Sequence, residues 1–361
     1  MVFGEEHVRG TSESDARDIV ERFLEAGGSH VDTANVYAGG RSEEILGRAL
    51  EGRRDQVTLA TKVRFRTGPG PNDEGLSRRH VLAAVEASLR RLRTDHVDLL
   101  YAHCWDPWTP LEETLEVFDE LVRRGVVRYV GVSNFRAWQV AKAVTLQRER
   151  RLAPFVAAQY QMSLVERDVD PEFESLCWEE GIAMVPWGPL GGGFLAGKYR
   201  PGERPSADDG RIGSTQDHQE EAWERRDRER NWRVLEAVRA IAREHDATPS
   251  QVALAWLLTR PTVATVLMGV RTLDQLEDNL GALEVRLSED EVERLDRLSA
   301  PESRYPYRMI ERYGARGGAA RADAAADRAR RVGAARLQGR RGGRRAPLVR
   351  GRARADRAAG R

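Results

Sequence analysis

Short runs of β-branched and other apolar residues alternate with longer amphipathic stretches between residues 13 and 300. This alternation predicts βαβ units and a parallel sheet. Seven apolar runs fit strands, and they lie at residues 30–34, 57–63, 97–103, 129–134, 155–162, 182–188 and 263–269. The pattern therefore predicts an α/β fold with one strand fewer than the eight of a closed barrel.

The amphipathic stretches between these runs predict the helices. They lie at residues 14–26, 41–51, 78–94, 111–124 and 136–149, and three more follow at 229–246, 249–260 and 288–299. Side chains that accept hydrogen bonds from free N–H groups favour the start of a helix. The expected caps are Ser42, Ser77, Thr109, and Thr248 or Ser250. Each crossover is long enough to bring the chain back parallel.

Two segments depart from this alternation. Residues 199–228 are polar and too long for a tight connection, so we expect a mobile loop over the functional site. Residues 311–361 hold sixteen Arg against four acidic residues and few large apolar ones, which predicts a disordered tail, weakly helical at 321–338. The predicted organisation is a barrel at residues 1–310 followed by this tail. Because Tyr313 is its only aromatic residue, nucleic-acid contact by the tail is not expected.

Composition narrows the class of protein. The chain has 361 residues, 40% of them hydrophobic, and a formal net charge of +1. It has no apolar run of about eighteen residues, and its N-terminus does not resemble a signal peptide, so we expect a cytoplasmic protein that does not bind membranes. Two separated cysteines, Cys104 and Cys177, favour neither a disulfide framework nor a metal site. Oligomeric state is not indicated.

Polar side chains gather at the carboxyl ends of the predicted strands, where a parallel barrel carries its active site. Asp32 and Tyr37 follow the first strand, Lys62 ends the second, and His103 ends the third. A buried ammonium needs a carboxylate partner. A neighbouring Lys⁺ also favours tyrosinate, so it is expected to lower the pKa of Tyr37. Together the four side chains suggest protonation of a carbonyl group coupled to hydride delivery.

Each of the four residues also has a purely structural interpretation. Asp32 and Lys62 could form a buried ion pair, Tyr37 could pack a loop, and His103 could be a hydrogen-bonded core histidine. Their position at three consecutive strand ends favours the functional interpretation. The sequence contains no serine nucleophile elbow, no HExxH metal motif and no GxGxxG after a strand, so competing chemistries and a Rossmann domain are disfavoured.

Several segments together resemble the aldo-keto reductases, over about residues 1 to 300. The segments are VDTANVY, ATK, YAHCWDP, GVSNF, PWGPLGGGFLAGKY and GVRTLDQLEDNL. The sequences of these segments are most similar to those of a bacterial branch near the potassium-channel β-subunit-like proteins and the sugar and glyceraldehyde reductases. The resemblance implies a (β/α)8 TIM barrel that binds NADP(H). In it, Tyr37 is the general acid, Lys62 and Asp32 tune it, and His103 orients the substrate carbonyl.

The resemblance also implies residues that hold the cofactor. They comprise a carboxamide group of Ser133, Asn134 and Gln159; a stacking Trp187; a pyrophosphate loop of Gly188, Leu190, Gly192 and Lys198; and a phosphate and adenine group of Gly269, Arg271, Gln275 and Asn279. Spacing of i, i+4 and i+8 would put Arg271, Gln275 and Asn279 on one helix face. A helix N-terminus with a guanidinium suits a 2′-phosphate, which favours NADP(H) over NAD(H). Each group also has a structural alternative. The carboxamide group could form ordinary strand-end hydrogen bonds, and Trp187 could pack in the core. The pyrophosphate loop could be a plain flexible loop, and the phosphate and adenine group could be a solvated helix face.

Three further expectations complete the interpretation. Phe65 and Trp105 are candidates for an aromatic substrate pocket, although packing between loops explains them equally well. Because the chain begins at MVFG, where the family has a first strand ending in a similar motif, we expect that strand to be truncated. The expected function is NADP(H)-dependent reduction of an aldehyde, ketone or sugar carbonyl. The alternative is an NADP(H)-binding redox-sensing or regulatory protein with little or no turnover, or a truncated inactive relative.

Overall fold

The computed structural model describes residues 3–4, 10–216 and 219–314. The chain divides into two compact units, Met1–Pro301 and Glu302–Arg361. In the second unit, helix α13 (Tyr307–Tyr313) includes the first three residues of the predicted tail. The prediction of disorder is therefore corrected for residues 311–313, which are helical. The remainder from 315 onward, including the weak helix expected at 321–338, lies outside the described residues, and the boundary after residue 310 stays a prediction.

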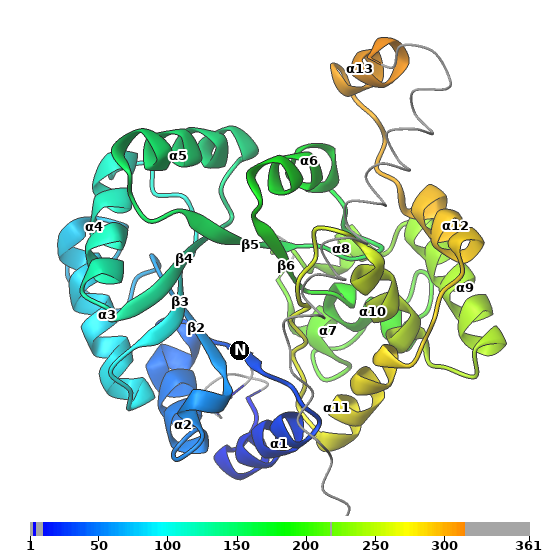
Figure 1. Ribbon diagram of the computed structural model, residues 1–361. Coiled ribbons are helices and arrows are strands. Elements are labelled where there is room, and N and C mark those ends of the chain that lie inside the picture. The colour runs from blue at the N-terminus through cyan, green and yellow to red at the C-terminus, as the bar shows by residue number, and fades with distance from the viewer. Residues whose placement is uncertain (1–2, 5–9, 217–218, 315–361) are drawn as a thin grey trace, which may run out of the picture. The chain divides into compact units, whose positions relative to one another are not determined.

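Six parallel strands form the sheet of the first unit, in the order in which they occur along the chain. They are β1 (His30–Asp32), β2 (Thr58–Val63), β3 (Val97–Ala102), β4 (Val127–Ser133), β5 (Phe155–Gln161) and β6 (Ala183–Trp187). The strands follow one another around a curve, with α3, α4 and α5 on its outer side (Figure 1). The predicted parallel α/β architecture is confirmed, as a curled sheet of six strands among the described residues and not as the full eight-stranded barrel.

The segment at residues 263–269 does not become the predicted seventh strand. It lies beside β6, where the backbone N–H of Ala264 donates to the Met184 carbonyl at 3.0 Å and that of Leu267 to the Pro186 carbonyl at 2.9 Å. A proline has no N–H, so Pro186 cannot donate on the side of β6 that faces this segment. The ladder stays incomplete for that reason. The expected truncated first strand falls on residues 1–4, of which 1–2 lie outside the described residues and Phe3 forms an isolated bridge with Thr11.

Eight of the described helices lie close to their predicted ranges. They are α1 (Glu13–Glu25), α2 (Arg41–Ala49), α3 (Arg78–Leu92), α4 (Leu111–Arg123), α5 (Ala137–Arg150), α9 (Glu229–Glu244), α10 (Pro249–Thr259) and α12 (Glu289–Ser299). The helix expected after Arg271 is α11 (Leu273–Leu280), and α6 (Asp170–Glu180) was not predicted. Ser77 and Thr248 are the expected N-caps. Ser42 and Thr109 are not, because Gly40 and Pro110 occupy the two cap positions. The Thr109 hydroxyl donates instead to Asp106 at 2.7 Å.

Most side chains of β2, β3 and β5 are buried on both faces, as parallel strands covered by helices require. Leu59, Val97 and Val130 from the strands pack with Val81 of α3 and Phe118 of α4 in one continuous core. None of these five side chains exposes more than 1% of its surface. Since each buried side chain of this size contributes about 1.5–3 kcal/mol, the core fixes the positions of the strand ends.

The segment at residues 199–228, apart from residues 217–218, holds more regular structure than the expected loop, and its mobility stays a prediction. It contains two short helices, α7 (Arg211–Ser214) and α8 (Trp223–Arg226). Ile212 and Trp223 are buried in a second core, together with Trp256 of α10. Trp223 contacts Trp232 edge to face, with ring centroids 6.2 Å apart. Polar residues dominate this segment, so its few apolar anchors carry no periodic signal in the sequence.

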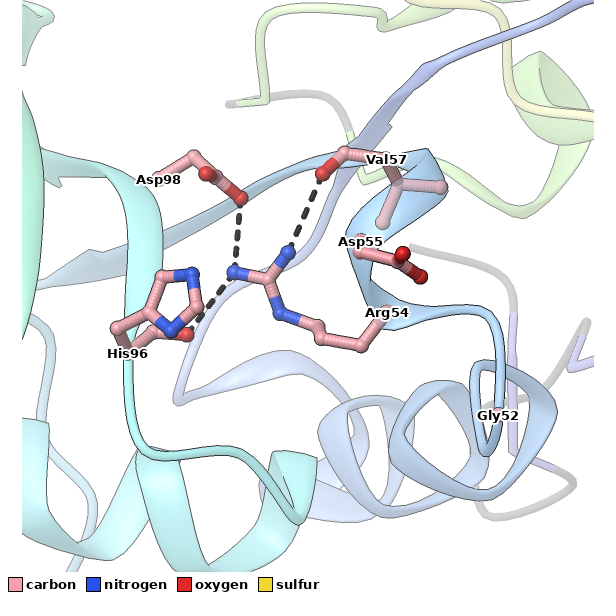
Figure 2. A pocket seen from close by; sticks show the side chains of 6 residues that line it. All are labelled: Gly52, Arg54, Asp55, Val57, His96 and Asp98. Carbon is pink, nitrogen blue, oxygen red and sulfur yellow. Dashed lines mark hydrogen bonds and ion pairs between the residues drawn. The ribbon is translucent and has the colours of Figure 1, made fainter.

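Arg54 ties the amino ends of β2 and β3 together, at the opposite end of the strands from the candidate site (Figure 2). The 3-10 helix η2 (Arg54–Gln56) carries this residue. Its guanidinium pairs with Asp98 at 2.7 Å and donates to the carbonyl groups of His96 at 2.9 Å and Val57 at 3.2 Å. Polar groups at this end of a parallel barrel are typical of stability and not of catalysis.

No helix in the described part of the chain combines the length and the apolar character needed to cross a bilayer. Within the same residues there is no group of three or more His, Cys, Asp or Glu that could hold a metal ion.

Candidate active site

The structure brings together the four polar side chains that end β1, β2 and β3. The Lys62 ammonium donates to an Asp32 carboxylate oxygen, to the Thr33 carbonyl at 2.8 Å and to the Tyr37 hydroxyl at 3.2 Å. Only 1% of the Lys62 surface is exposed. All three donor positions of the ammonium are therefore used, and Tyr37 is held directly against a buried positive charge.

Two local features of the chain place these groups. The 3-10 helix η1 (Tyr37–Gly40) turns the chain from β1 into α2, with Gly39 and Gly40 at φ 62° and 99°, where a side chain would be strained. On the outer face of β2, the Thr61 hydroxyl donates to buried Glu43 at 2.6 Å, and Arg91 pairs with the same carboxylate at 2.7 Å. Because neighbouring side chains of a strand point to opposite faces, this outer cluster fixes β2 while Lys62 points inward.

Burial and charge act in opposite directions at Lys62 and Tyr37. Burial lowers the pKa of the Lys62 ammonium, but the charges and hydrogen bonds of Asp32 and Tyr37 outweigh burial and raise it. Burial raises the pKa of the Tyr37 hydroxyl more than Lys62 lowers it. The expected net lowering of the Tyr37 pKa is therefore wrong. The free energy lost when the phenolate leaves water is larger than the free energy gained from its attraction to the Lys62 ammonium. Tyr37 keeps its proton at neutral pH, as a proton donor must.

His103 is neutral and is packed between two rings. Its imidazole contacts Tyr37 edge to face at a centroid separation of 5.7 Å and Phe65 at 4.7 Å. Burial, helped by the nearby charges of Lys62 and Arg64, lowers the pKa of His103 to about 2. A neutral imidazole has one N–H donor and one acceptor nitrogen. Its Nδ1 is buried without a hydrogen-bond partner among the described residues, so His103 has hydrogen-bonding capacity to offer a ligand.

This neutral His103 predicts a pH-dependent loss of stability. The unfolded chain takes up a proton on this side chain below about pH 6.5, whereas the folded chain does so only near pH 2. The free energy of unfolding therefore falls as the pH drops through this window, by about 2 kcal/mol at pH 5 from His103 alone. Denaturant titrations of the wild type and of His103→Gln at pH 7 and pH 5 measure it. Equal losses in both proteins would refute the assignment.

Ser133, Asn134 and Gln159 form one hydrogen-bonded chain across the neighbouring strand ends. The side-chain amide of Gln159 donates to the second Asp32 oxygen at 2.8 Å, and the Ser133 hydroxyl donates to the backbone carbonyl of Gln159 at 2.7 Å. The Asn134 amide donates to the His103 carbonyl at 2.8 Å and to the Ser133 hydroxyl at 3.0 Å. These hydrogen bonds thus join the three residues expected to bind the carboxamide to the four central side chains.

The glycine-rich loop begins where β6 ends at Trp187. Gly188 and Gly192 have φ values of 65° and 73°, and Leu190 is the N-cap of the 3-10 helix η3 (Gly191–Ala196). A Cβ atom on Gly191 would lie 2.6 Å from the Val165 side chain, so the backbone passes too close for any other residue. Lys198 follows this loop, with its ammonium 5.1 Å from the centroid of the Tyr199 ring. Backbone that turns through such conformations suits an anion such as a pyrophosphate.

The predicted phosphate group lies at the start of α11. Thr272 is the N-cap, and the Arg271 N–H donates to the Gln275 side chain at 2.9 Å. Gly269 lies at the end of the segment beside β6. Arg271 and Gln275 are exposed, whereas Asn279 exposes only 8% of its surface. The expected shared helix face is therefore corrected, because α11 begins at Leu273 and Arg271 belongs to the turn before it.

Arg211 and Glu221, both from the segment at 199–228, are polar residues of this region that the sequence analysis missed. They form an ion pair, and Glu221 is 4% exposed. A Glu221 carboxylate oxygen would lie 3.3 Å from a Cβ atom on Gly188, and the charge of Arg211 reaches Tyr37. This segment therefore borders the site, as expected. No motif or periodicity indicates which of its many charged residues turn inward.

The comparisons with known proteins agree with this geometry. A model of the aldo/keto reductase family matches residues 1–300. The norsolorinic acid reductase stcV of Emericella nidulans is 35% identical over 287 residues, which cover 77% of this chain and 70% of the relative. A probable voltage-gated potassium channel subunit beta of Arabidopsis thaliana is 34% identical over 275 residues (75% and 82%). The uncharacterized oxidoreductase YrpG of Bacillus subtilis is 34% identical over 291 residues (78% and 85%).

Proposed function

Because the chain belongs to the aldo/keto reductase family, we propose that it is an NADP(H)-dependent oxidoreductase that reduces an aldehyde, ketone or sugar carbonyl to the alcohol. The observation that carries this proposal is the contact of the buried Lys62 ammonium with both Asp32 and the Tyr37 hydroxyl, 3.2 Å away. Relatives such as the norsolorinic acid reductase and an aryl-alcohol dehydrogenase of Pestalotiopsis microspora support a carbonyl or alcohol substrate. A cytoplasmic location stays a prediction.

Residues of this chain fit a bound nicotinamide dinucleotide. Ser133, Asn134 and Gln159 carry the hydroxyl and amide groups that a carboxamide requires, and the indole of Trp187 offers a ring face. The proposed phosphate contacts are Gly188, Leu190, Gly192, Lys198, Gly269, Arg271, Gln275 and Asn279. The positive-φ glycines and the exposed Arg271 before α11 support these contacts.

The reduced nicotinamide supplies the hydride to the carbonyl carbon when it is bound. The Tyr37 hydroxyl gives its proton to the carbonyl oxygen, and the phenolate that remains is stabilised by the Lys62 ammonium beside it. His103 uses a ring N–H to orient the same carbonyl oxygen without carrying a charge. Asp32 keeps Lys62 protonated, and a proton from solvent restores Tyr37 after the product leaves.

The preference for NADP(H) predicts a selective effect at Arg271. Arg271→Ala is expected to weaken NADPH binding about tenfold to hundredfold, because it removes a charge-assisted hydrogen bond to the 2′-phosphate. NADH has no such phosphate, so its dissociation constant should not change. Fluorescence titration with both cofactors measures this, with Arg286→Ala as the control at another exposed arginine. An equal loss of affinity for NADH would mean that Arg271 does not bind the 2′-phosphate.

The second candidate is an NADP(H)-binding regulatory protein with weak or no turnover. It is favoured by the 34% identity to a probable voltage-gated potassium channel subunit beta. Oxidation of NADPH in the presence of a panel of aldehydes separates the two functions, since only the reductase consumes cofactor in proportion to the alcohol formed.

A further inference from the structure

Arg64 lies two residues beyond Lys62, just after β2 ends at Val63. Its guanidinium carbon is 5.4 Å from the centroid of the Phe65 ring, and the Phe65 ring centroid is 4.7 Å from that of His103. The charge of Arg64 also reaches His103 and contributes to its low pKa. Arg64 is therefore a cation one aromatic ring away from the imidazole that orients the carbonyl.

The guanidinium of Arg64 has no carboxylate partner in the described part of the chain. Its Nε is buried and donates no hydrogen bond there. Arg66, two residues further on, is more exposed, yet it pairs with Glu74 and donates to the Gly70 carbonyl at 3.0 Å. The buried Nε atoms of Arg226, Arg230 and Arg260 are also unpaired, but each of those guanidinium groups donates through an Nη atom. Guanidinium groups that leave water are normally satisfied by acceptors, so the absence of any such bond from Arg64 among the described residues points to a ligand.

The carboxylate of Asp106 is close enough to Arg64 for the two charges to interact, but it accepts no hydrogen bond from the Arg64 guanidinium. One Asp106 oxygen accepts from the Leu76 N–H at 2.8 Å and the Thr109 hydroxyl at 2.7 Å, and the other accepts from the Trp108 N–H at 3.0 Å. No ion pair joins Asp106 to Arg64 among the described residues. Asp106 therefore holds the loop after β3, and Arg64 keeps its donors.

We propose that Arg64 binds a carboxylate on the substrate, so that the enzyme prefers carbonyl compounds with an anionic group several bonds from the reacting carbon. This inference rests on the proposed reductase function and names its substrate class. A guanidinium matches a carboxylate with two parallel hydrogen bonds, and Arg64 can provide such a fork. A phosphate dianion would call for more donors than one guanidinium supplies.

The ring beside Arg64 favours a flat connection between the two ends of such a substrate. Phe65 contacts both Arg64 and His103. Trp105, half-buried after β3, packs edge to face on Phe135 with centroids 5.0 Å apart. Aromatic surfaces bind planar groups well. 4-Formylbenzoate and its methyl ester are therefore suitable probes, since they share the aldehyde and the ring and differ in the charge.

The experiment compares kcat/KM for these two aldehydes in the wild type, Arg64→Met, Arg64→Lys and the control Arg66→Met. Arg64→Met is expected to lose about tenfold to hundredfold on 4-formylbenzoate, through KM, and less than threefold on the ester. Arg64→Lys should recover part of the loss, because it keeps the charge but not the fork. Arg66→Met should match the wild type on both.

Three other results would overturn the inference or separate it from the proposed function. Equal losses of Arg64→Met on both aldehydes would make Arg64 structural. An Arg64-dependent preference for glyceraldehyde 3-phosphate over glyceraldehyde, without one for 4-formylbenzoate, would replace the carboxylate by a phosphate. If the wild type reduces no aldehyde, the reductase function fails, and binding of 4-(hydroxymethyl)benzoate by tryptophan fluorescence decides the role of Arg64. Binding that Arg64→Met abolishes would support it, and unchanged or absent binding would refute it.

Discussion

Tyr37→Phe is expected to lower kcat for aldehyde reduction by about a hundredfold to ten-thousandfold, the range that a positioned general acid contributes. The substitution removes the hydroxyl that meets the Lys62 ammonium at 3.2 Å and leaves the ring against His103. Affinity for NADPH should stay within a factor of about two, because the phenol is not among the proposed cofactor contacts. Steady-state kinetics and a fluorescence titration with NADPH measure the two quantities.

Tyr129→Phe is the matched control for this prediction. Tyr129 lies on β4 with 59% of its surface exposed, and it has no role in the proposed site. Its variant should behave as the wild type in both measurements. Full turnover by Tyr37→Phe would show that another group, or water, protonates the carbonyl oxygen.

Lys62→Met has the largest expected effect on stability. It removes the partner of a carboxylate whose side chain is only 8% exposed, and an uncompensated buried charge costs about 3–5 kcal/mol. Activity should also be lost, because the phenolate of Tyr37 would have no cation beside it. Denaturant unfolding at neutral pH measures the loss of stability, and NADPH oxidation measures the loss of activity.

Two further variants isolate the cause of that effect. Lys142→Met changes an exposed lysine of α5 and should leave both stability and activity unchanged. Lys62→Met combined with Asp32→Asn removes both charges, so it should recover most of the stability but none of the activity. A double variant as unstable as Lys62→Met would assign the loss to packing of the lysine stem and not to the unpaired carboxylate.

The strand ends of the candidate site could be predicted because they depend on local patterns alone. Apolar runs locate β1, β2 and β3, and parallel strands in sequential order align their carboxyl ends. In the observed register Asp32 pairs with Ala60, and Lys62 pairs with Tyr101. The proximity of Asp32 and Lys62 to each other and to His103 therefore follows from strand assignment and from the inward alternation of side chains.

Other features depend on contacts between distant segments, which carry no local pattern. Glu43 is a buried acid on α2 because Thr61 and Arg91, 18 and 48 residues away, meet it there. Glu221 is buried and pairs with the exposed Arg211 because Ile212 and Trp223 anchor this segment in the second core. The direction of the Tyr37 pKa was missed for a different reason. Desolvation depends on the whole packed environment, whereas the sequence indicates only that a lysine is near.

The seventh predicted strand shows how one residue can interrupt a correct pattern. Residues 263–269 are apolar and lie beside β6 as expected, yet Pro186 removes the donor that a regular ladder would need. The same stretch leads through Gly269 to Arg271 and α11, so the irregular segment still delivers the proposed phosphate contacts to their position.

The central claim is that Tyr37 protonates a carbonyl group while NADPH delivers a hydride to it. The most direct test is the mass of the alcohol formed from methyl 4-formylbenzoate and NADPH that carries deuterium at both hydrogens of nicotinamide C4. We predict one deuterium on the carbinol carbon and one NADP⁺ for each alcohol with the wild type, and almost no alcohol with Tyr37→Phe. Tight NADPH binding by the wild type without deuterated alcohol from this or any other aldehyde would contradict the account.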